Sequence, residues 1–234
     1  KELKKQLTIR WDMILFMLGL EFCLFVFCEI LLLCVTQIFH QDEAFEIGTI
    51  MTLVATSSIL IIGDTNTLAL SFNTGISMGG TRRRLVPAYF IVSYLECLSA
   101  SFFAFLLYQL ETWILKTFYS SMEATHVVSQ CFQPKYILTA SLAITALNTV
   151  FGTLFLKFGK YAFIALWILW FLCFTILPRM GRILPKYQDT VWGRACMNLL
   201  SNLTEGRLIA SIAVLSFLLL LISWLMLRRQ QVKV

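Results

Sequence analysis

The chain has 234 residues, of which 59% are hydrophobic and 14% charged. A soluble domain carries roughly 45–50% apolar and 25% charged residues, so this apolar excess cannot be buried in one globular core. The composition excludes an ordinary soluble enzyme, a disordered chain and a fibrous repeat, and it indicates a protein that folds in a lipid bilayer. The formal net charge is +6, but the bases lie mostly between apolar runs. No nucleic-acid partner is therefore predicted.

The first segment, residues 1–11, predicts a basic amphipathic helix. Leu3, Leu7 and Trp11 recur every four residues, while Arg10 and three lysines lie on the other faces. A helix of this kind lies along the cytoplasmic surface of a membrane, with its apolar side in the lipid and its bases among the head groups.

Six apolar runs follow, each close to the length that a helix needs to cross a bilayer. The predicted spans are residues 13–39, 47–70, 86–110, 136–156, 161–177 and 208–227. In lipid only helices or closed barrels satisfy the backbone, and these runs are too long and too continuous for barrel strands. The predicted fold class is all-α, a single polytopic membrane domain over residues 1–234.

The positions of the basic residues predict the orientation. With the N-terminus inside, twelve of the 19 Lys and Arg residues fall on cytoplasmic segments. The turn after the first span has three acids and no base, and the turn at 157–160 has two bases. Cytoplasmic loops are rich in Lys and Arg, so both termini are expected in the cytoplasm.

Residues 178–206 form the predicted outer segment between the last two spans. They mix apolar residues with four bases, a fifth base, Arg207, follows directly, and Trp192 is a candidate interface anchor. This pattern predicts an amphipathic or re-entrant segment, with a plain loop as the alternative. Cys131 and Cys196 both fall on the outside, and whether they form a disulfide is left open.

Several common catalytic motifs are missing from the sequence. It contains no P-loop, no dinucleotide-binding glycine pattern and no HExxH. Only two histidines are present, and the seven cysteines form no CxxC pair. No catalytic or metal-binding residue and no cofactor is therefore predicted in this chain, and the expected function is not enzymatic.

The connection between the second and third spans, residues 71–85, is the most informative cytoplasmic segment. Gly79 and Gly80 allow a sharp turn, and Thr81 can cap the helix that follows. The run Arg82–Arg84 then opposes the preference for acids at a helix N-terminus. The three arginines either anchor the inner side of the membrane or form a docking element for an acidic partner.

The run Gly79-Gly80-Thr81-Arg82-Arg83 resembles the loop that precedes the third helix in the permeases of bacterial ABC-2-type transporters. The layout is similar over essentially the whole chain. The shared features are a basic amphipathic N-terminal helix, six spans, a short inner turn after the fourth span and a partly apolar outer segment. The strongly basic outer segment departs from the pattern.

The resemblance implies a transport subunit in a bacterial cell membrane. Such a permease forms half of a translocation path, as a homodimer or with a related permease. A separate ABC ATPase subunit binds ATP and Mg²⁺ and drives movement through the segment Gly79–Arg84. The family exports peptides, drugs, lipids and polysaccharides, and an amphipathic or antimicrobial peptide is the expected cargo here.

Four acids fall within the predicted spans: Glu21, Glu29, Asp64 and Glu96. Glu21 and Glu96 are both expected about midway across, from a rise of about 1.5 Å per residue. No Lys or Arg is expected mid-span to pair with them. Intramembrane acids usually face a partner or a wet cavity. They are either neutral carboxyl groups bonded between helices or an acidic path for a cationic amphipathic substrate.

Two other classes of function remain open on the sequence. One is the substrate-binding six-helix subunit of a vitamin importer, which would also be small, polytopic and without an ATPase. The other is a sensory membrane protein with no transport role. The amphipathic N-terminus and the arginine-rich connection favour the exporter.

Overall fold

The computed structural model describes residues 2–39, 43–77, 82–118, 123–125, 128–162 and 204–229, together with 164–165, 167–168, 171–172 and 175. Long α-helices dominate this part of the chain, joined by two three-residue strands and one turn of 3-10 helix. The elements are α1 (Glu2–Phe39), β1 (Glu43–Phe45), α2 (Ile47–Ser77), α3 (Arg82–Phe118), β2 (Glu123–Thr125), the 3-10 helix η1 (Ser129–Phe132), α4 (Pro134–Phe158) and α7 (Glu205–Arg229).

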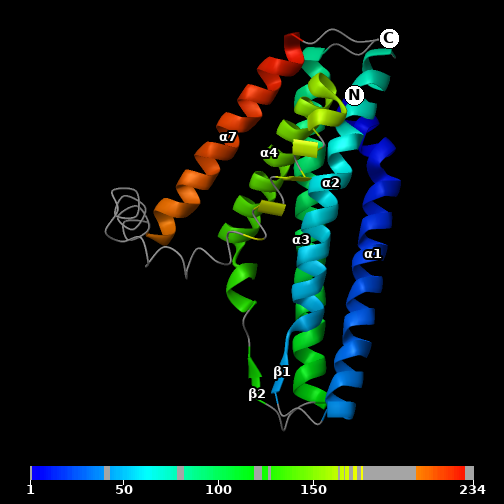
Figure 1. Ribbon diagram of the computed structural model, residues 1–234, viewed down its shortest axis with the longest axis vertical. Helices are drawn as coiled ribbons and strands as arrows, with labels where there is room; N and C mark the ends of the chain where they lie inside the picture. Colours follow the sequence, from blue (N-terminus) through cyan, green and yellow to red (C-terminus); the bar gives the residue numbers. More distant parts are fainter. Residues whose placement is uncertain are drawn as a thin grey trace.

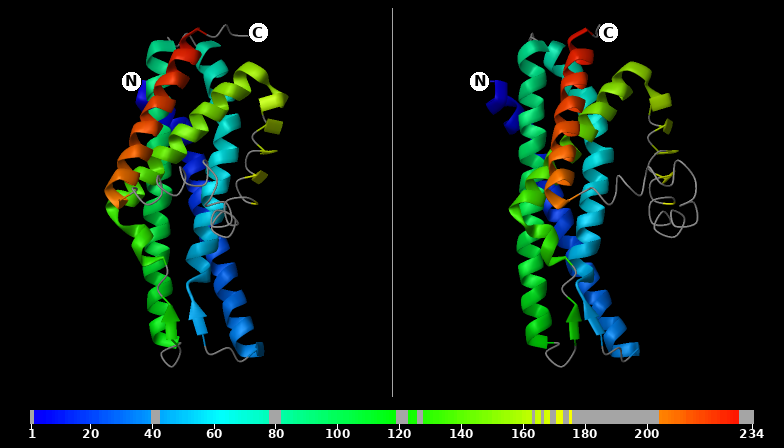
Figure 2. Two further views of the ribbon diagram at one scale, coloured as in Figure 1. Left: turned by 60° about the vertical axis from the view of Figure 1, so that its left-hand side comes forward. Right: turned by 90° about the vertical axis from the view of Figure 1, so that its left-hand side faces the viewer.

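The helices form an elongated bundle (Figure 1). Helix α2 packs against α1, α3 and α4, and α7 packs mainly on α4. Strands β1 and β2 pair in parallel, with Glu43 opposite Glu123. The start of α1, the end of α2, the start of α3 and the ends of α4 and α7 gather at one end of the bundle, and the two strands lie at the other (Figure 2). Helices α1 and α3 therefore run in the same direction.

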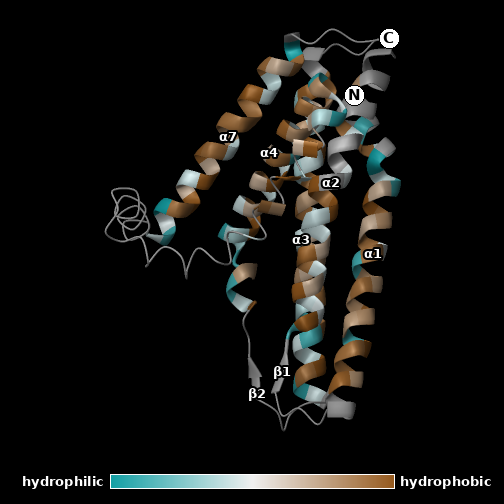
Figure 3. Cartoon of the chain, viewed as in Figure 1, coloured by the Kyte–Doolittle hydropathy of each residue, from teal (hydrophilic) through white to brown (hydrophobic). Residues whose placement is uncertain are grey.

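The bundle has an apolar surface, and its interior contains polar as well as apolar side chains. Large apolar side chains stand on the surface, among them Phe16 (69% exposed) and Phe217 (71% exposed). Hydrophobic residues predominate along the described helices (Figure 3). Polar side chains such as Thr49, Ser93 and Thr153 are fully buried instead. Soluble proteins bury their apolar residues, so this distribution fits helices that face lipid and bond to one another inside.

Four of the described helices are long and apolar enough to cross a membrane: Gln6–Val35, Leu85–Thr117, Pro134–Phe158 and Glu205–Arg228. They coincide with the first, third, fourth and sixth predicted spans. The second predicted span falls within α2, whose strongly apolar part is Ile47–Ile61. The fifth span and the outer segment 178–206 lie mostly outside the described residues, so the total of six spans stays a prediction.

Two boundaries differ from the sequence prediction. Residues 2–11 belong to the continuous helix α1 rather than to a separate surface helix. No Gly or Pro occurs between Glu2 and Leu18, so nothing in the local sequence ends the helix there. The predicted connection 71–85 is mostly helical, because α2 continues to Ser77 and α3 begins at Arg82.

Helix α4 fits closely against α2. A Cβ atom on Gly152 would lie 2.5 Å from Leu68 Cδ2, so only a glycine permits this approach. Small residues at such crossings let membrane helices pack by van der Waals contact. The helix ends at Gly159, whose φ of 59° lies in the left-handed region and whose N–H donates to the Phe155 carbonyl.

Candidate functional site: polar clusters inside the bundle

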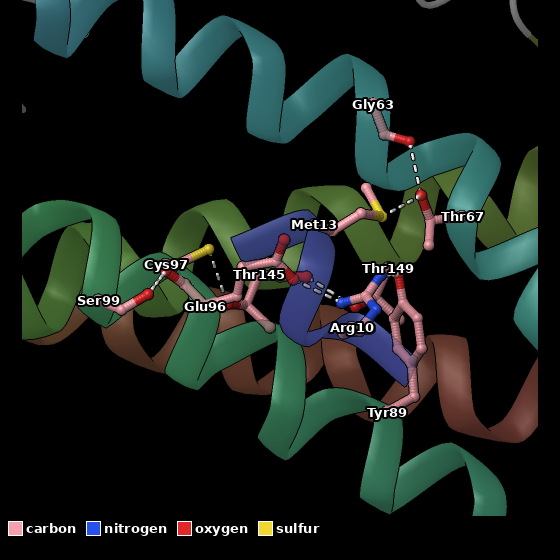
Figure 4. Close-up of polar contacts among 10 residues, drawn as sticks. All are labelled: Arg10, Met13, Gly63, Thr67, Tyr89, Glu96, Cys97, Ser99, Thr145 and Thr149. Carbon is pink, nitrogen blue, oxygen red and sulfur yellow. Dashed lines mark hydrogen bonds and ion pairs between the residues drawn. The ribbon is translucent and has the colours of Figure 1, made fainter. Parts of the chain in front are cut away.

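A buried ion pair joins α1 to α3. Arg10 Nη1 donates to Glu96 Oε2 at 2.7 Å, and each residue is 1% exposed. Arg10 Nη2 donates to the Tyr89 hydroxyl at 3.2 Å, and the guanidinium carbon lies 4.6 Å from the centre of the Tyr89 ring. Figure 4 shows the guanidinium group held between Glu96 and Tyr89. Two residues 86 positions apart thus share one charge-neutral cluster, as intramembrane charges usually require.

The ion pair lies beside a polar face of α4. Five α4 residues at helical spacing are buried with at most 1% exposure: Ser141, Thr145, Asn148, Thr149 and Thr153. The hydroxyl groups of Thr145, Thr149 and Thr153 each donate to the carbonyl four residues earlier. Thr145 also lies 3.6 Å from the sulfur of Cys97, the neighbour of Glu96 (Figure 4). This face offers hydroxyl and amide groups but no charge, and its three threonine hydroxyls are satisfied within their own helix.

A second cluster caps the N-terminus of α2. Glu111 of α3 accepts hydrogen bonds from the backbone N–H groups of Gly48 and Thr49, both at 2.9 Å. The Thr49 hydroxyl donates to the same carboxyl group. The first N–H groups of a helix have no partner within it, and a carboxylate there also meets the positive end of the helix dipole. A side chain 63 residues away thus supplies the cap.

Glu29 of α1 joins this cluster. Its carboxyl group lies close to the carboxyl group of Glu111 on α3. Its Oε1 atom would lie 2.6 Å from a Cβ on Gly48. Nearby, Glu46 accepts a hydrogen bond from the backbone N–H of Val128 at 3.0 Å. These contacts fix the start of α2 against α1, α3 and the segment before α4.

Glu21 occupies a third position, between the other two along α1. It is 1% exposed and lies beside Thr56 of α2. Neither carboxylate oxygen nor the Thr56 hydroxyl makes a hydrogen bond of ordinary geometry within the described part of the chain. Burying an ionised carboxylate in this way is costly, so we expect Glu21 to be a neutral acid.

The structure therefore divides the predicted acids rather than joining them in one path. Glu96 forms an ion pair with Arg10, and Glu29 lies beside Glu111. Glu21 belongs to neither of these clusters and lies beside Thr56. The expectation that no base pairs with these acids was wrong, as was the common depth of Glu21 and Glu96. Glu96 lies level with Arg10, and Glu21 is about 16 Å further along α1, at about 1.5 Å per residue. Asp64 is on α2, but its side chain is outside the described residues.

The predicted coupling segment is only partly described. Gly79, Gly80 and Thr81 lie outside the described residues. Arg82, Arg83 and Arg84 form the first turn of α3, and their side chains are not described. Cys131 is an exposed residue of η1 and forms no disulfide with any cysteine that the structure describes. Cys196 lies outside the described residues, so their pairing stays open.

Sequence reasoning missed Arg10 and Glu111. Arg10 was assigned to the membrane surface because the first span was expected to begin at residue 13. The absence of a helix breaker after Glu2 was the signal that places it one turn inside the span Gln6–Val35. Glu111 was one residue beyond the predicted third span. Within the described residues no group of three or more His, Cys, Asp or Glu side chains could hold a metal ion.

The apolar surface, the polar interior and the four long apolar helices together define a polytopic α-helical membrane protein. No family model, curated protein or solved structure matches the chain. Its function is therefore argued from its own residues and their arrangement.

Proposed function

We propose that this chain is the membrane-spanning permease subunit of an ATP-driven ABC exporter. It forms half of a translocation path, with a second copy or a related permease as the other half, and a separate ATPase subunit supplies the energy. This chain would need no cofactor of its own, because ATP and Mg²⁺ bind to the partner ATPase subunit. The proposed cargo is an amphipathic or antimicrobial peptide.

One observation carries the proposal: the N-terminus of α3, which follows the basic connection in the sequence, lies at the same end of the bundle as the start of α1 and the ends of α4 and α7 (Figure 1). Helix α3 begins there with Arg82, next to the start of α1 and the end of α7 at Arg229. Lys157 is in the last turn of α4 at the same end. The opposite end carries the strands, with Glu43 and Glu123. By the positive-inside rule we assign the basic end to the cytoplasm, where an ATPase binds.

The ion pair described above offers a route for coupling. It attaches the first turns of α1 to α3, the helix that directly follows the basic connection. A displacement of the α3 N-terminus is therefore passed to α1 through a contact that is costly to break inside the bundle. Both helices belong to the segments that an ATPase on this end would move.

The test is recovery of the partners from the native membrane. The chain is purified in mild detergent, and the proteins retained with it are identified by mass spectrometry. The expected result is an ABC ATPase, together with a second permease half. Replacing Arg82, Arg83 and Arg84 by Glu should release the ATPase.

A second charge-reversed variant tests whether loss of the ATPase is specific to Arg82, Arg83 and Arg84. Lys157→Glu with Lys160→Glu changes the other inner turn, and we expect it to retain more ATPase than the triple variant. Both variants must elute as single species of wild-type size. A well-behaved wild-type preparation without any ATPase contradicts the exporter. Tight binding of a vitamin by that preparation would then favour the importer subunit. If the preparation retains no ATPase and binds no vitamin, the sensory membrane protein is the remaining alternative.

A further inference from the structure

A cavity of about 390 Å³ opens between α2, α3, η1 and the first turns of α4. It lies outside the three polar clusters. Leu53 of α2, Ser101 of α3 and Ala140 of α4 line it, with Cys131 and Phe132 from η1. Its volume is within the range of about 300–1,000 Å³ that is usual for small-molecule sites. Its lining is mainly apolar.

The wall formed by η1 is held in place before any ligand arrives. Phe132 stacks on Tyr108 with 4.9 Å between ring centres and also contacts Phe105 at 5.6 Å. The backbone of η1 is tied by the Cys131 N–H to the Val128 carbonyl at 2.9 Å. Val128 in turn donates its N–H to the buried Glu46. A preformed aromatic wall lowers the entropy cost of binding a flat or flexible apolar group.

The polar groups at the cavity are neutral. Ser101 donates its hydroxyl to the Cys97 carbonyl at 2.9 Å, and its oxygen lies 3.4 Å from the Ser141 hydroxyl, which leaves one acceptor lone pair for a ligand. Tyr136 donates its hydroxyl to Glu205 at 2.6 Å, and Lys135 pairs with that same carboxylate. No charged side chain lines the cavity among the described residues. A ligand carrying a net charge would therefore lose its hydration without gaining a counter-charge.

We propose that this cavity is a binding site for a neutral apolar group, either a ring system or a length of hydrocarbon chain, with at most one or two hydrogen-bonding atoms. The aromatic wall favours such a group by contact, and the Ser101 hydroxyl is the hydrogen-bond partner at its inner side. The group belongs either to a free small molecule or to the acyl tail of a bilayer lipid. The site does not depend on the exporter function, since it uses none of the residues at the basic end.

Disulfide capture at Cys131 tests the site. Two mixed disulfides of 2-mercaptoethanol are used, one carrying a neutral 2-phenylethyl group and one a cationic 2-aminoethyl group. The Cys131 thiolate attacks the fragment sulfur, forms a new disulfide and releases 2-mercaptoethanol, so the step is balanced. The Cys196→Ser variant keeps the Cys131 thiol free. Peptide mass spectrometry at a fixed thiol concentration measures the occupancy of each cysteine at equilibrium.

The expected result is a preference for the phenylethyl fragment at Cys131 of about tenfold, from burial of one ring against the wall. Cys34 is an exposed cysteine on α1 and serves as the internal control. Its preference reports partition into the surrounding detergent alone. A preference at Cys131 no greater than at Cys34 overturns the proposal, and this comparison needs no cavity variant.

A matched pair of variants locates the preference. Ala140→Phe places a ring in the cavity and should abolish the excess, which is the amount by which the phenylethyl preference at Cys131 exceeds that at Cys34. Leu138→Phe adds bulk on the neighbouring surface of α4, where Leu138 is 50% exposed, and should leave the excess unchanged. An excess that survives Ala140→Phe in a monodisperse protein also overturns the proposal.

Comparing capture in the absence and in the presence of lipid shows whether the bound group comes from a lipid tail or from a free small molecule. The capture is repeated in delipidated detergent and in nanodiscs of phosphatidylglycerol and phosphatidylcholine. A fall in capture at Cys131 in nanodiscs, with Cys34 unchanged relative to its detergent value, identifies a lipid tail as the resident group. Capture that persists in nanodiscs identifies a site kept for a free small molecule.

Discussion

Replacing Glu96 by Gln removes one charge from the buried pair and nearly keeps the size of the side chain. Arg10 then remains in a position where it is 1% exposed, beside the neutral hydroxyl group and ring of Tyr89. A guanidinium group cannot lose its proton in a protein. The charge therefore stays buried without its counter-ion, and the folded state must carry that cost.

The expected cost is large and asymmetric. Breaking a buried pair by removing one partner costs about 3–5 kcal/mol, and we expect Glu96→Gln to fall in this range. Arg10→Met should cost less, roughly 1–2 kcal/mol, because a carboxylate left alone can become neutral by binding a proton. In the double variant no charge remains buried, so its loss should be smaller than the sum of the two single losses by about 2 kcal/mol or more.

Reversible unfolding in mixed SDS and mild-detergent micelles, followed by tryptophan fluorescence, gives these free energies. The exposed pair of Lys135 and Glu205 is the internal control, and Glu205→Gln should leave the midpoint unchanged. Strict additivity of Arg10→Met and Glu96→Gln would refute the reasoning. So would a Glu96→Gln variant as stable as wild type.

Three further changes probe the rest of the bundle by the same unfolding assay. Gly152→Ala places a methyl group against the Leu68 side chain and should cost about 1–3 kcal/mol, whereas Gly19→Ala meets open space and should stabilise α1 by up to about 1 kcal/mol. Equal effects would contradict the close approach of α4 to α2. Glu21→Met removes a carboxyl group that lacks a hydrogen bond of ordinary geometry within the described residues and should leave stability unchanged or higher; a loss above about 2 kcal/mol would reveal a partner for it. Glu111→Gln weakens the cap on α2 and should cost about 1–2 kcal/mol, with faster hydrogen exchange at the start of that helix, and unchanged exchange there would argue against the cap.

The sequence by itself determined the class of protein and the positions of several helices. Hydropathy is a property of consecutive residues, so the runs at 86–110 and 136–156 marked two helices. The structure extends the second run by two residues at each end, and it extends the first run to Arg82–Phe118. The hydropathy run that begins at residue 13 did not indicate the true start of α1, which is Glu2. The bases before Met13 were assigned to the membrane surface, although a continuous helix carries Arg10 into the bundle.

Only the tertiary structure decided which polar residues meet. The pairs Arg10–Glu96 and Gly48–Glu111 join helices whose contacting residues are 86 and 63 positions apart. Local sequence does not encode the rotation or the relative height of two helices, because these depend on how side chains from both fit together. Gly152 allows α4 to approach Leu68, and this fit helps to set which face of α4 is buried. The acids were visible from the sequence, but their partners came from the packing.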